Sequence, residues 1–324
     1  MSTATLIFSI SRNLFRYGGP IVLVAGSFSC ILNIIVFTKS TLRKNPCTVC
    51  LIGVNTINFL CFNQTFLLLM LLLGYGIDFI TRNIFECRFQ CYIAPVLSCL
   101  ESSYMILASV DRTLITSTDV NRRNFSTRRL VSIAMIIMAV FWLAAHIHAL
   151  IFTHIYQLGP NNYSCYYQTG VYTIIMTYYA LVVNGALPPL LMAFFALWTM
   201  KNISEVRRTR LDSRANNMNS TVIGRHFILQ SKDYQLVRML LLDILIFIIC
   251  KCPASFMLLY QQITDYVDKS TEQRSIEQSI LSMTYFVYYI ENGVSFYTNM
   301  LVSKTFRKEL KHTLTDIHLP YFRH

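Results

Sequence analysis

Three charged side chains stand inside long apolar stretches of this sequence. Lys251 interrupts the stretch from 242 to 260, Glu101 and Glu291 interrupt two others, and Asp243 is a fourth candidate. Ionisable residues in such stretches usually face a protein interior, where they pair with one another or mark a functional site. One ammonium group and two carboxyl groups could form a buried ion pair, bind a charged ligand, or relay protons or ions.

Four interpretations of Lys251 follow from its position. Helical rise places it about 15 Å below the top of its run and the two glutamates about 21–22 Å below theirs, and a lysine reaches roughly 6 Å. The first interpretation is therefore an internal ion pair, with Glu291 as the first partner and Glu101 as the second. The others are a cation at the floor of a ligand pocket, a lysine bonded to retinal, and a deprotonated lysine. Pro253 also frees the carbonyl of Ile249, which Lys251 could bind.

The composition of the chain predicts that these charged residues lie on membrane-spanning helices. Of 324 residues, 54% are hydrophobic and only 14% are charged, which is unusual for a soluble protein. Runs of about 20 apolar residues suffice to cross a membrane as helices. Seven such runs lie at about 20–41, 47–73, 87–115, 129–152, 170–200, 234–261 and 276–302. We expect an all-α membrane protein that forms a seven-transmembrane helix bundle.

The distribution of positive charge predicts the orientation. The net charge is +12, and 20 of the 28 Lys and Arg lie in the loops after runs one, three and five and in the tail. Basic residues concentrate on the cytoplasmic side. We therefore expect an N-terminus outside, a cytoplasmic C-terminus and contact with anionic lipid. No basic–aromatic face predicts nucleic-acid binding.

The third apolar run has a cysteine at one end and a pair of charged residues at the other. It begins near Cys87 and ends at Asp111-Arg112, and 25 residues from Cys87 to Arg112 correspond to about 37 Å of helix. The loop after run four holds Cys165. Two cysteines outside the cell are expected to form a disulfide. Cys91, one turn further along, is a second candidate for that bond, and two unrelated thiols are the alternative.

These three features together resemble the rhodopsin-like G-protein-coupled receptors. That family has a Cys at the top of helix three, an Asp-Arg-aromatic triplet at its foot and a Cys in the second outer loop; here the triplet reads Asp111-Arg112-Thr113. The resemblance implies that Arg112 contacts an acid on helix six in the inactive state. Asp233, 20 residues before Pro253, occupies that position. It also implies that helix six moves outward to admit a G protein.

The resemblance extends to the other helices with departures. Matching positions are Asn33, Trp142, Pro188, Phe247 and Pro253. The resemblance implies that Pro188, Phe247 and Pro253 belong to a switch between helices five and six. The family's helix-two Asp is replaced by Asn58 or, less well placed, Asn55, and its tryptophan switch by Lys251. The end of run seven reads Ser295-Phe296-Tyr297-Thr298-Asn299 in place of Asn-Pro-x-x-Tyr. The predicted core polar network comprises Asn33, Asn58, Glu101, Lys251, Glu291, Asn292 and Ser295.

The chain is thereby divided into three parts. Residues 1–19 are expected to be an extracellular N-terminus, 20–302 the receptor domain, and 303–324 a cytoplasmic tail. In that tail, Phe306, Leu310 and Leu314 share one face among lysines and arginines, which predicts a short interfacial eighth helix. The expected location is the plasma membrane.

The ligand is less well determined by sequence. Amine receptors carry an acid where this chain has Ala94, which argues against a biogenic amine. Candidate contacts are Ala94, Tyr166, Tyr167, Tyr178 and Lys251, and Asn162 heads a glycosylation sequon. The sequence looks like invertebrate neuropeptide receptors, including those for FMRFamide-like peptides; an orphan chemoreceptor fits equally, and the ligand could also be a small molecule.

We expect no enzyme activity, cofactor or metal, since the sequence has no nucleophile elbow, phosphate loop or metal-ligand set. The alternative class is a seven-helix transporter or retinal protein that uses Glu101, Lys251 and Glu291 as a relay.

Overall fold

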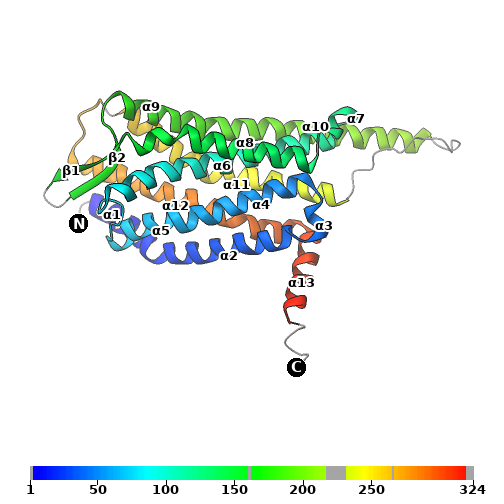
Figure 1. Ribbon diagram of the computed structural model, residues 1–324, viewed down its shortest axis with the longest axis horizontal. Coiled ribbons are helices and arrows are strands. Elements are labelled where there is room, and N and C mark those ends of the chain that lie inside the picture. The colour runs from blue at the N-terminus through cyan, green and yellow to red at the C-terminus, as the bar shows by residue number, and fades with distance from the viewer. Residues whose placement is uncertain (1–2, 160–161, 217–230, 265, 319–324) are drawn as a thin grey trace.

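The computed structural model shows a bundle of long helices that run side by side (Figure 1). It describes residues 3–159, 162–216, 231–264 and 266–318, and side chains within them except at 41, 158–159, 162, 206–216, 231–236, 314 and 316–318. The elements are α1 Thr3–Asn13, η1 Leu14–Gly18, α2 Gly19–Phe37, α3 Ser40–Arg43, α4 Pro46–Leu60, η2 Cys61–Phe66, α5 Leu67–Met70, η3 Leu71–Tyr75, α6 Ile84–Thr116, α7 Val120–Asn124, α8 Arg128–Ala145, η4 Ile147–Leu150, β1 Thr153–Gly159, β2 Asn162–Tyr167, α9 Val171–Tyr179, η5 Ala180–Ala186, α10 Leu187–Asn216, α11 Ser231–Ile263, α12 Thr271–Val302 and α13 Lys304–His318.

Six helical segments in the described part of the chain are long and apolar enough to cross a membrane. They are Thr3–Phe37, Pro46–Tyr75, Ile84–Thr116, Arg128–Leu150, Val171–Glu205 and Val237–Ile263. The architecture is that of an all-α, multi-pass membrane protein. Helix α12 is long enough, with 32 residues, but its polar residues lower its hydropathy below that of the other six. The predicted seventh span is therefore a helix, but its hydropathy alone does not identify it as a membrane-spanning helix.

The two ends of the bundle differ in structure. The two-stranded hairpin β1–β2 and the N-terminus lie at one end, which we call the hairpin end (Figure 1). Helix α13 lies at the other, which we call the α13 end, and it runs across the direction of the long helices. Phe306 of α13 is buried and packs edge-on against Phe37 of α2 and Phe296 of α12. The amphipathic tail predicted from sequence is thus a helix anchored by one aromatic side chain.

The first helix begins earlier than its apolar run predicts. Helical structure starts at Thr3 and continues through the π-helical turn η1 into α2, so residues 3–19 are not a separate segment. The reason is local packing. Phe15 is fully buried, with its ring 5.3 Å from that of Phe286 and 6.4 Å from that of Phe66. An apolar run predicts the part of a helix that faces lipid. It does not predict how far the helix continues where aromatic contacts with other helices stabilise it.

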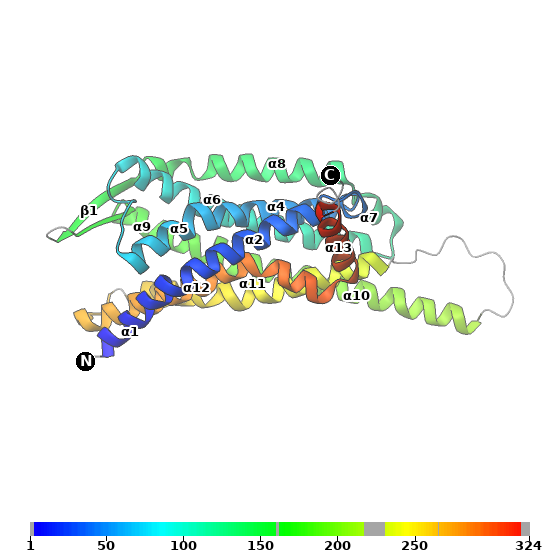
Figure 2. The same cartoon turned by 90° about the horizontal axis from the view of Figure 1, so that it is seen from below.

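The hairpin was not predicted from sequence. β1 and β2 pair antiparallel, with Thr153 opposite Tyr167 and Ile155 opposite Cys165. Its strands are seven and six residues long, and it lies at the hairpin end of the bundle in both views (Figure 2). This pairing fixes where Cys165, Tyr166 and Tyr167 lie over the end of α6.

Helices α2 and α12 approach closely at two glycines. A Cβ on Gly293 would lie 2.7 Å from the Cα of Gly26 and 3.2 Å from the Phe62 ring, and one on Gly26 would lie 2.3 Å from that ring. Small residues allow such close backbone approach in membrane helices. This contact holds the polar face of α12 against α2.

We expect Gly293→Val to destabilise the protein by about 1–3 kcal/mol, because the added side chain must displace the α2 backbone or the Phe62 ring. Thermal unfolding of the purified chain in detergent, followed by thiol-reactive dye fluorescence, measures the effect. Ala144→Val on the exposed face of α8 is the matched control. Equal melting temperatures for the two variants would show that the crossing tolerates bulk.

Candidate functional site

A buried charge cluster lies midway along the bundle, where α6, α11 and α12 meet. Lys251 of α11 places its Nζ against Glu101 Oε2 of α6, to which it donates a hydrogen bond, and 3.2 Å from Glu291 Oε2 of α12. The three side chains are 4%, 1% and 7% exposed. Sequence reasoning offered Glu291 first and Glu101 second; the structure brings both to Lys251, and the oxygen that accepts the closer contact belongs to Glu101.

Aromatic rings complete the surroundings of Lys251. Its Nζ lies 4.5 Å from the ring centroid of Phe247 and 4.5 Å from that of Tyr288. A cation over a ring face is stabilised by the ring quadrupole. The Tyr288 hydroxyl is in turn hydrogen-bonded to Ser98 of α6 at 2.8 Å. Sequence analysis assigned Phe247 to a helix-six switch and missed Tyr288, although Tyr288 lies about one helical turn before Glu291.

The cluster contains two acids and one base. Glu101 Oε1 is buried and has no hydrogen-bond partner among the described residues. Removing charge from water costs several kcal/mol per ion unless partners compensate it. The group is neutral only when one of the two carboxyl groups holds a proton. This arrangement can therefore tie three helices together and can also exchange a proton when they separate.

A network of amides lies between this cluster and the α13 end. Asn33 of α2 donates to Asn55 Oδ1 of α4 at 2.7 Å and lies 2.6 Å from Ser295 Oγ of α12. Asn299 donates to Asn33 at 3.4 Å. Each of these amides is buried, so the network links α2, α4 and α12 through polar contacts that lipid could not replace.

The two asparagines that sequence analysis offered at the helix-two acid position, Asn58 and Asn55, have different partners. Asn55, the less favoured candidate, contacts Asn33, whereas Asn58 accepts a hydrogen bond from Asn292 at 3.2 Å, one turn closer to the charge cluster. The reason is that the Asn45 side chain caps α4 by accepting from the Cys47 N–H, which fixes where α4 starts relative to α2. Asp243, the fourth charged candidate, accepts from the Thr298 hydroxyl at 3.0 Å.

Arg112 is fully buried at the α13 end of α6. It donates to Asp111 Oδ2 at 2.9 Å and to the side-chain oxygen of Asn45. Asp111 also accepts from the Ser126 hydroxyl at 2.5 Å, so the loop between α6 and α8 is tied to the same carboxylate. The side chain of Asp233, the predicted partner on α11, lies outside the described residues, as does that of Asn162.

Thr113, which follows the Asp111-Arg112 pair, has a packing role of its own. Its hydroxyl lies 3.0 Å from that of Thr199 and donates to the Phe195 carbonyl at 3.2 Å. Asn202 donates to the Thr113 carbonyl at 3.1 Å. These contacts join α6 to α10, and sequence reasoning missed them because three small polar residues in two apolar runs give no clear signal.

A disulfide joins Cys87 of α6 to Cys165 of β2 at the hairpin end. Cys91, the second candidate, is a free thiol whose Sγ lies 3.6 Å from Cys165 Sγ. The hairpin is further attached by Arg88, which donates to the Thr153 carbonyl at 3.3 Å, and by Tyr167, which donates to the Cys91 carbonyl at 3.1 Å. Burial raises the pKa of the Tyr167 hydroxyl, which keeps it a donor.

The candidate ligand contacts lie on several different elements. Tyr166 and Tyr167 lie on the hairpin with ring centroids 5.7 Å apart, and Ala94 is half-buried on α6. Tyr178 is 50% exposed, and its role as a ligand contact stays a prediction. Tyr179 faces the bundle instead, with its hydroxyl 3.2 Å from His146 Nε2 and 3.7 Å from Cys99 Sγ. Neighbouring residues on a helix point in different directions. The sequence therefore does not tell which of two consecutive tyrosines faces the interior of the bundle.

The two prolines of the predicted switch lie at irregular points of their helices. Pro188 is buried in the first turn of α10, directly after the π-helical turn η5, and Pro253 lies inside α11. A Cβ on Gly185 in η5 would lie 2.7 Å from Ser255 Oγ. Two helix irregularities therefore face each other across a close contact, and π-turns of this kind are frequent at functional sites.

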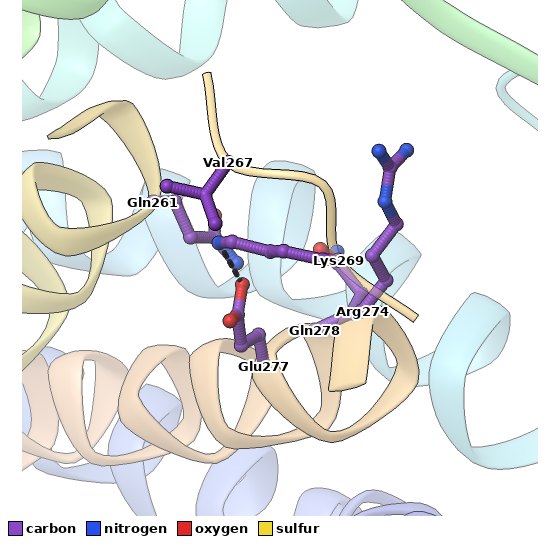
Figure 3. Close-up of a pocket in the computed structure, with 6 residues that line it drawn as sticks. All are labelled: Gln261, Val267, Lys269, Arg274, Glu277 and Gln278. Carbon is purple, nitrogen blue, oxygen red and sulfur yellow. Dashed lines mark hydrogen bonds and ion pairs between the residues drawn. The ribbon is translucent and has the colours of Figure 1, made fainter. Parts of the chain in front are cut away.

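A small polar pocket opens between the end of α11 and the start of α12 (Figure 3). Its volume is about 230 Å³, and it is lined by Gln261, Val267, Lys269, Arg274, Glu277 and Gln278. Lys269 Nζ lies 2.5 Å from Glu277 Oε2, whereas Arg274 points away from this pair (Figure 3). Ligand pockets are usually larger and mostly apolar. The Lys269–Glu277 ion pair, which we call the clasp, holds the connection between α11 and α12 against α12, and Tyr260 of α11 donates to the same carboxylate.

Comparison with protein-family models and with curated proteins finds no match for this chain.

Proposed function

We propose that this chain is a rhodopsin-like G-protein-coupled receptor with α12 as the seventh crossing. In this proposal the hairpin end faces outside, and α13 lies along the cytoplasmic surface of the plasma membrane as the interfacial eighth helix. An extracellular ligand, a peptide or a small molecule rather than a biogenic amine, shifts α11 outward and opens the α13 end to a heterotrimeric G protein.

The observation that carries the proposal is the organisation of α6. One end is bonded covalently to the hairpin through Cys87, and the other holds Arg112 buried against Asp111 and Asn45. The 25 residues between Cys87 and Arg112 correspond to about 37 Å of helix, more than the hydrocarbon thickness. A fixed outer end and a buried charge at the inner end suit a helix that holds still while its neighbour moves.

The place of α12 as a crossing is supported by the direction of its polar groups. Glu291, Asn292 and Asn299 are buried, and each contacts a residue of another helix or lies in the charge cluster. A membrane helix accommodates polar side chains when they face the interior of a bundle. Low overall hydropathy is therefore compatible with a membrane span.

The proposal is tested by G-protein dissociation in cells that express the chain and are exposed to a library of amidated peptides. An active peptide should lose its response when Arg112 is changed to Ala. The exposed Arg129, in the first turn of α8, supplies the matched control, since Arg129→Ala should leave the response in place. A response that survives Arg112→Ala would contradict the proposed coupling.

The second candidate function is an ion or proton transporter, and the excess carboxyl group of the charge cluster favours it. Purified chain in liposomes should then carry a proton flux that Glu291→Gln removes. A flux together with no G-protein response to any ligand would replace the receptor proposal with this one.

A further inference from the structure

Three sulfur atoms meet at the hairpin end. Cys87 and Cys91 are four residues apart on α6 and therefore share a face of that helix. The first is bonded to Cys165, and the second is a free thiol whose Sγ lies 3.6 Å from the same Cys165 Sγ. A free thiol in van der Waals contact with a disulfide sulfur is in position for exchange, which proceeds by attack of one sulfur on another.

We propose that Cys165 exchanges its disulfide between Cys87 and Cys91. Cys91 loses its proton to water, and its sulfur forms a bond to Cys165 Sγ. The Cys165–Cys87 bond breaks, its electron pair goes to Cys87 Sγ, and that sulfur takes up a proton. One disulfide and one thiol are present before and after, so the step requires neither oxidant nor reductant.

The hairpin is already held at the level of Cys91. Tyr167, two residues after Cys165, donates to the Cys91 carbonyl at 3.1 Å. A disulfide bond is about 2.05 Å long, so the contact of 3.6 Å needs to shorten by only about 1.5 Å. This movement is small enough for a two-stranded hairpin to make without unpairing from α6.

The exchange would change the mouth of the bundle. Tyr166 and Tyr167 directly follow Cys165 along β2, so a bond to Cys91 draws both rings toward the part of α6 around Cys91. Cys87 would become the free thiol, beside the His154 carbonyl. The exchange itself does not depend on the proposed receptor function; only its consequence for a ligand does.

Proteolysis can distinguish the Cys87–Cys165 disulfide from the Cys91–Cys165 disulfide. Arg88 lies between the two cysteines, so trypsin places Cys87 and Cys91 in different peptides. The purified full-length chain is equilibrated in a mixture of reduced and oxidised glutathione, quenched with acid, alkylated with N-ethylmaleimide while denatured, and digested without reduction. We expect Cys165 cross-linked to both peptides, with Cys87 alkylated in the fraction that carries the Cys91–Cys165 bond. Alkylation of Cys91 alone, with Cys87 always protected, would overturn the proposal.

Variants provide an independent measurement. In Cys87→Ala, Cys165 should remain protected from alkylation, whereas in Cys87→Ala/Cys91→Ala it should be fully alkylated. Cys99→Ala is the matched control, since Cys99 lies on the tryptic peptide of Cys91 but contacts Asn184 and Tyr179 instead, and its loss should change nothing. An alkylated Cys165 in Cys87→Ala would show that Cys91 does not accept the bond.

Discussion

Replacing Lys251 by methionine is expected to destabilise the protein by about 3–5 kcal/mol, the usual cost of removing one partner from a buried ion pair. The ammonium group lies against Glu101 and Glu291, and both carboxyl groups are buried. Without it, two acids of like charge remain in a medium that solvates neither. The variant should show reduced surface expression and a lower melting temperature in detergent.

The control variants remove the charges of the cluster one after another. Lys251→Met/Glu291→Gln still leaves one uncompensated acid, so it should recover part of the loss. Lys251→Met/Glu101→Gln/Glu291→Gln removes every charge and should recover most of it. Lys201→Met, at an exposed position of α10, tests for a general effect of this substitution. If the triple variant is no more stable than the single one, the cluster does not stabilise the bundle through its charges.

The axial positions of the charged residues could be predicted from sequence because helical rise is regular. Counting residues from the ends of apolar runs placed Lys251, Glu101 and Glu291 at compatible depths, and the structure brings them into contact. Direction around the helix axis is harder to predict. Four π-helical turns interrupt the helices in the described part of the chain, and each changes which residues share a face.

Offsets between neighbouring helices could not be predicted from the sequence either. Asn55 and Asn58 differ by three residues, or about 4.5 Å of rise, and the choice between them depends on where α4 begins relative to α2. That is decided by the connection, in which α3 takes up four residues and Asn45 caps the next helix. Composition alone does not report such a cap contact, so the sequence did not indicate which of the two asparagines contacts Asn33; in the structure it is Asn55.

Contacts outside the apolar runs could not be predicted by the same method. The hairpin, the helical N-terminal extension and the Lys269–Glu277 clasp involve short or polar segments. Their positions follow from tertiary contacts, such as Phe15 against Phe286, rather than from local pattern. Apolar periodicity describes the part of the chain that meets lipid, whereas the residues that organise the mouth of the bundle must be found from the structure.

Removing the disulfide should give the second large effect. Cys165→Ser is expected to destabilise the protein by about 2–3 kcal/mol. The bonded cysteines are 78 residues apart, and the chain-entropy relation gives roughly 4.5 kcal/mol for a loop of that length. Membrane helices do not unfold to a random coil, however, because their backbones remain hydrogen-bonded in lipid. The loop that the disulfide closes is thus already restricted, and the lower part of the usual range applies.

A control variant separates the loss of the disulfide from the loss of packing around a sulfur atom. Cys91→Ser removes a sulfur from the same site but leaves Cys87 and Cys165 bonded, so its melting temperature should stay close to that of the unchanged chain. Cys165 is the one cysteine that both partners on α6 require, and its replacement should therefore be more harmful than that of Cys87, for which Cys91 can substitute. Equal melting temperatures for Cys165→Ser and Cys91→Ser would show that the hydrogen bonds from Arg88 and Tyr167 hold the hairpin without a covalent bond.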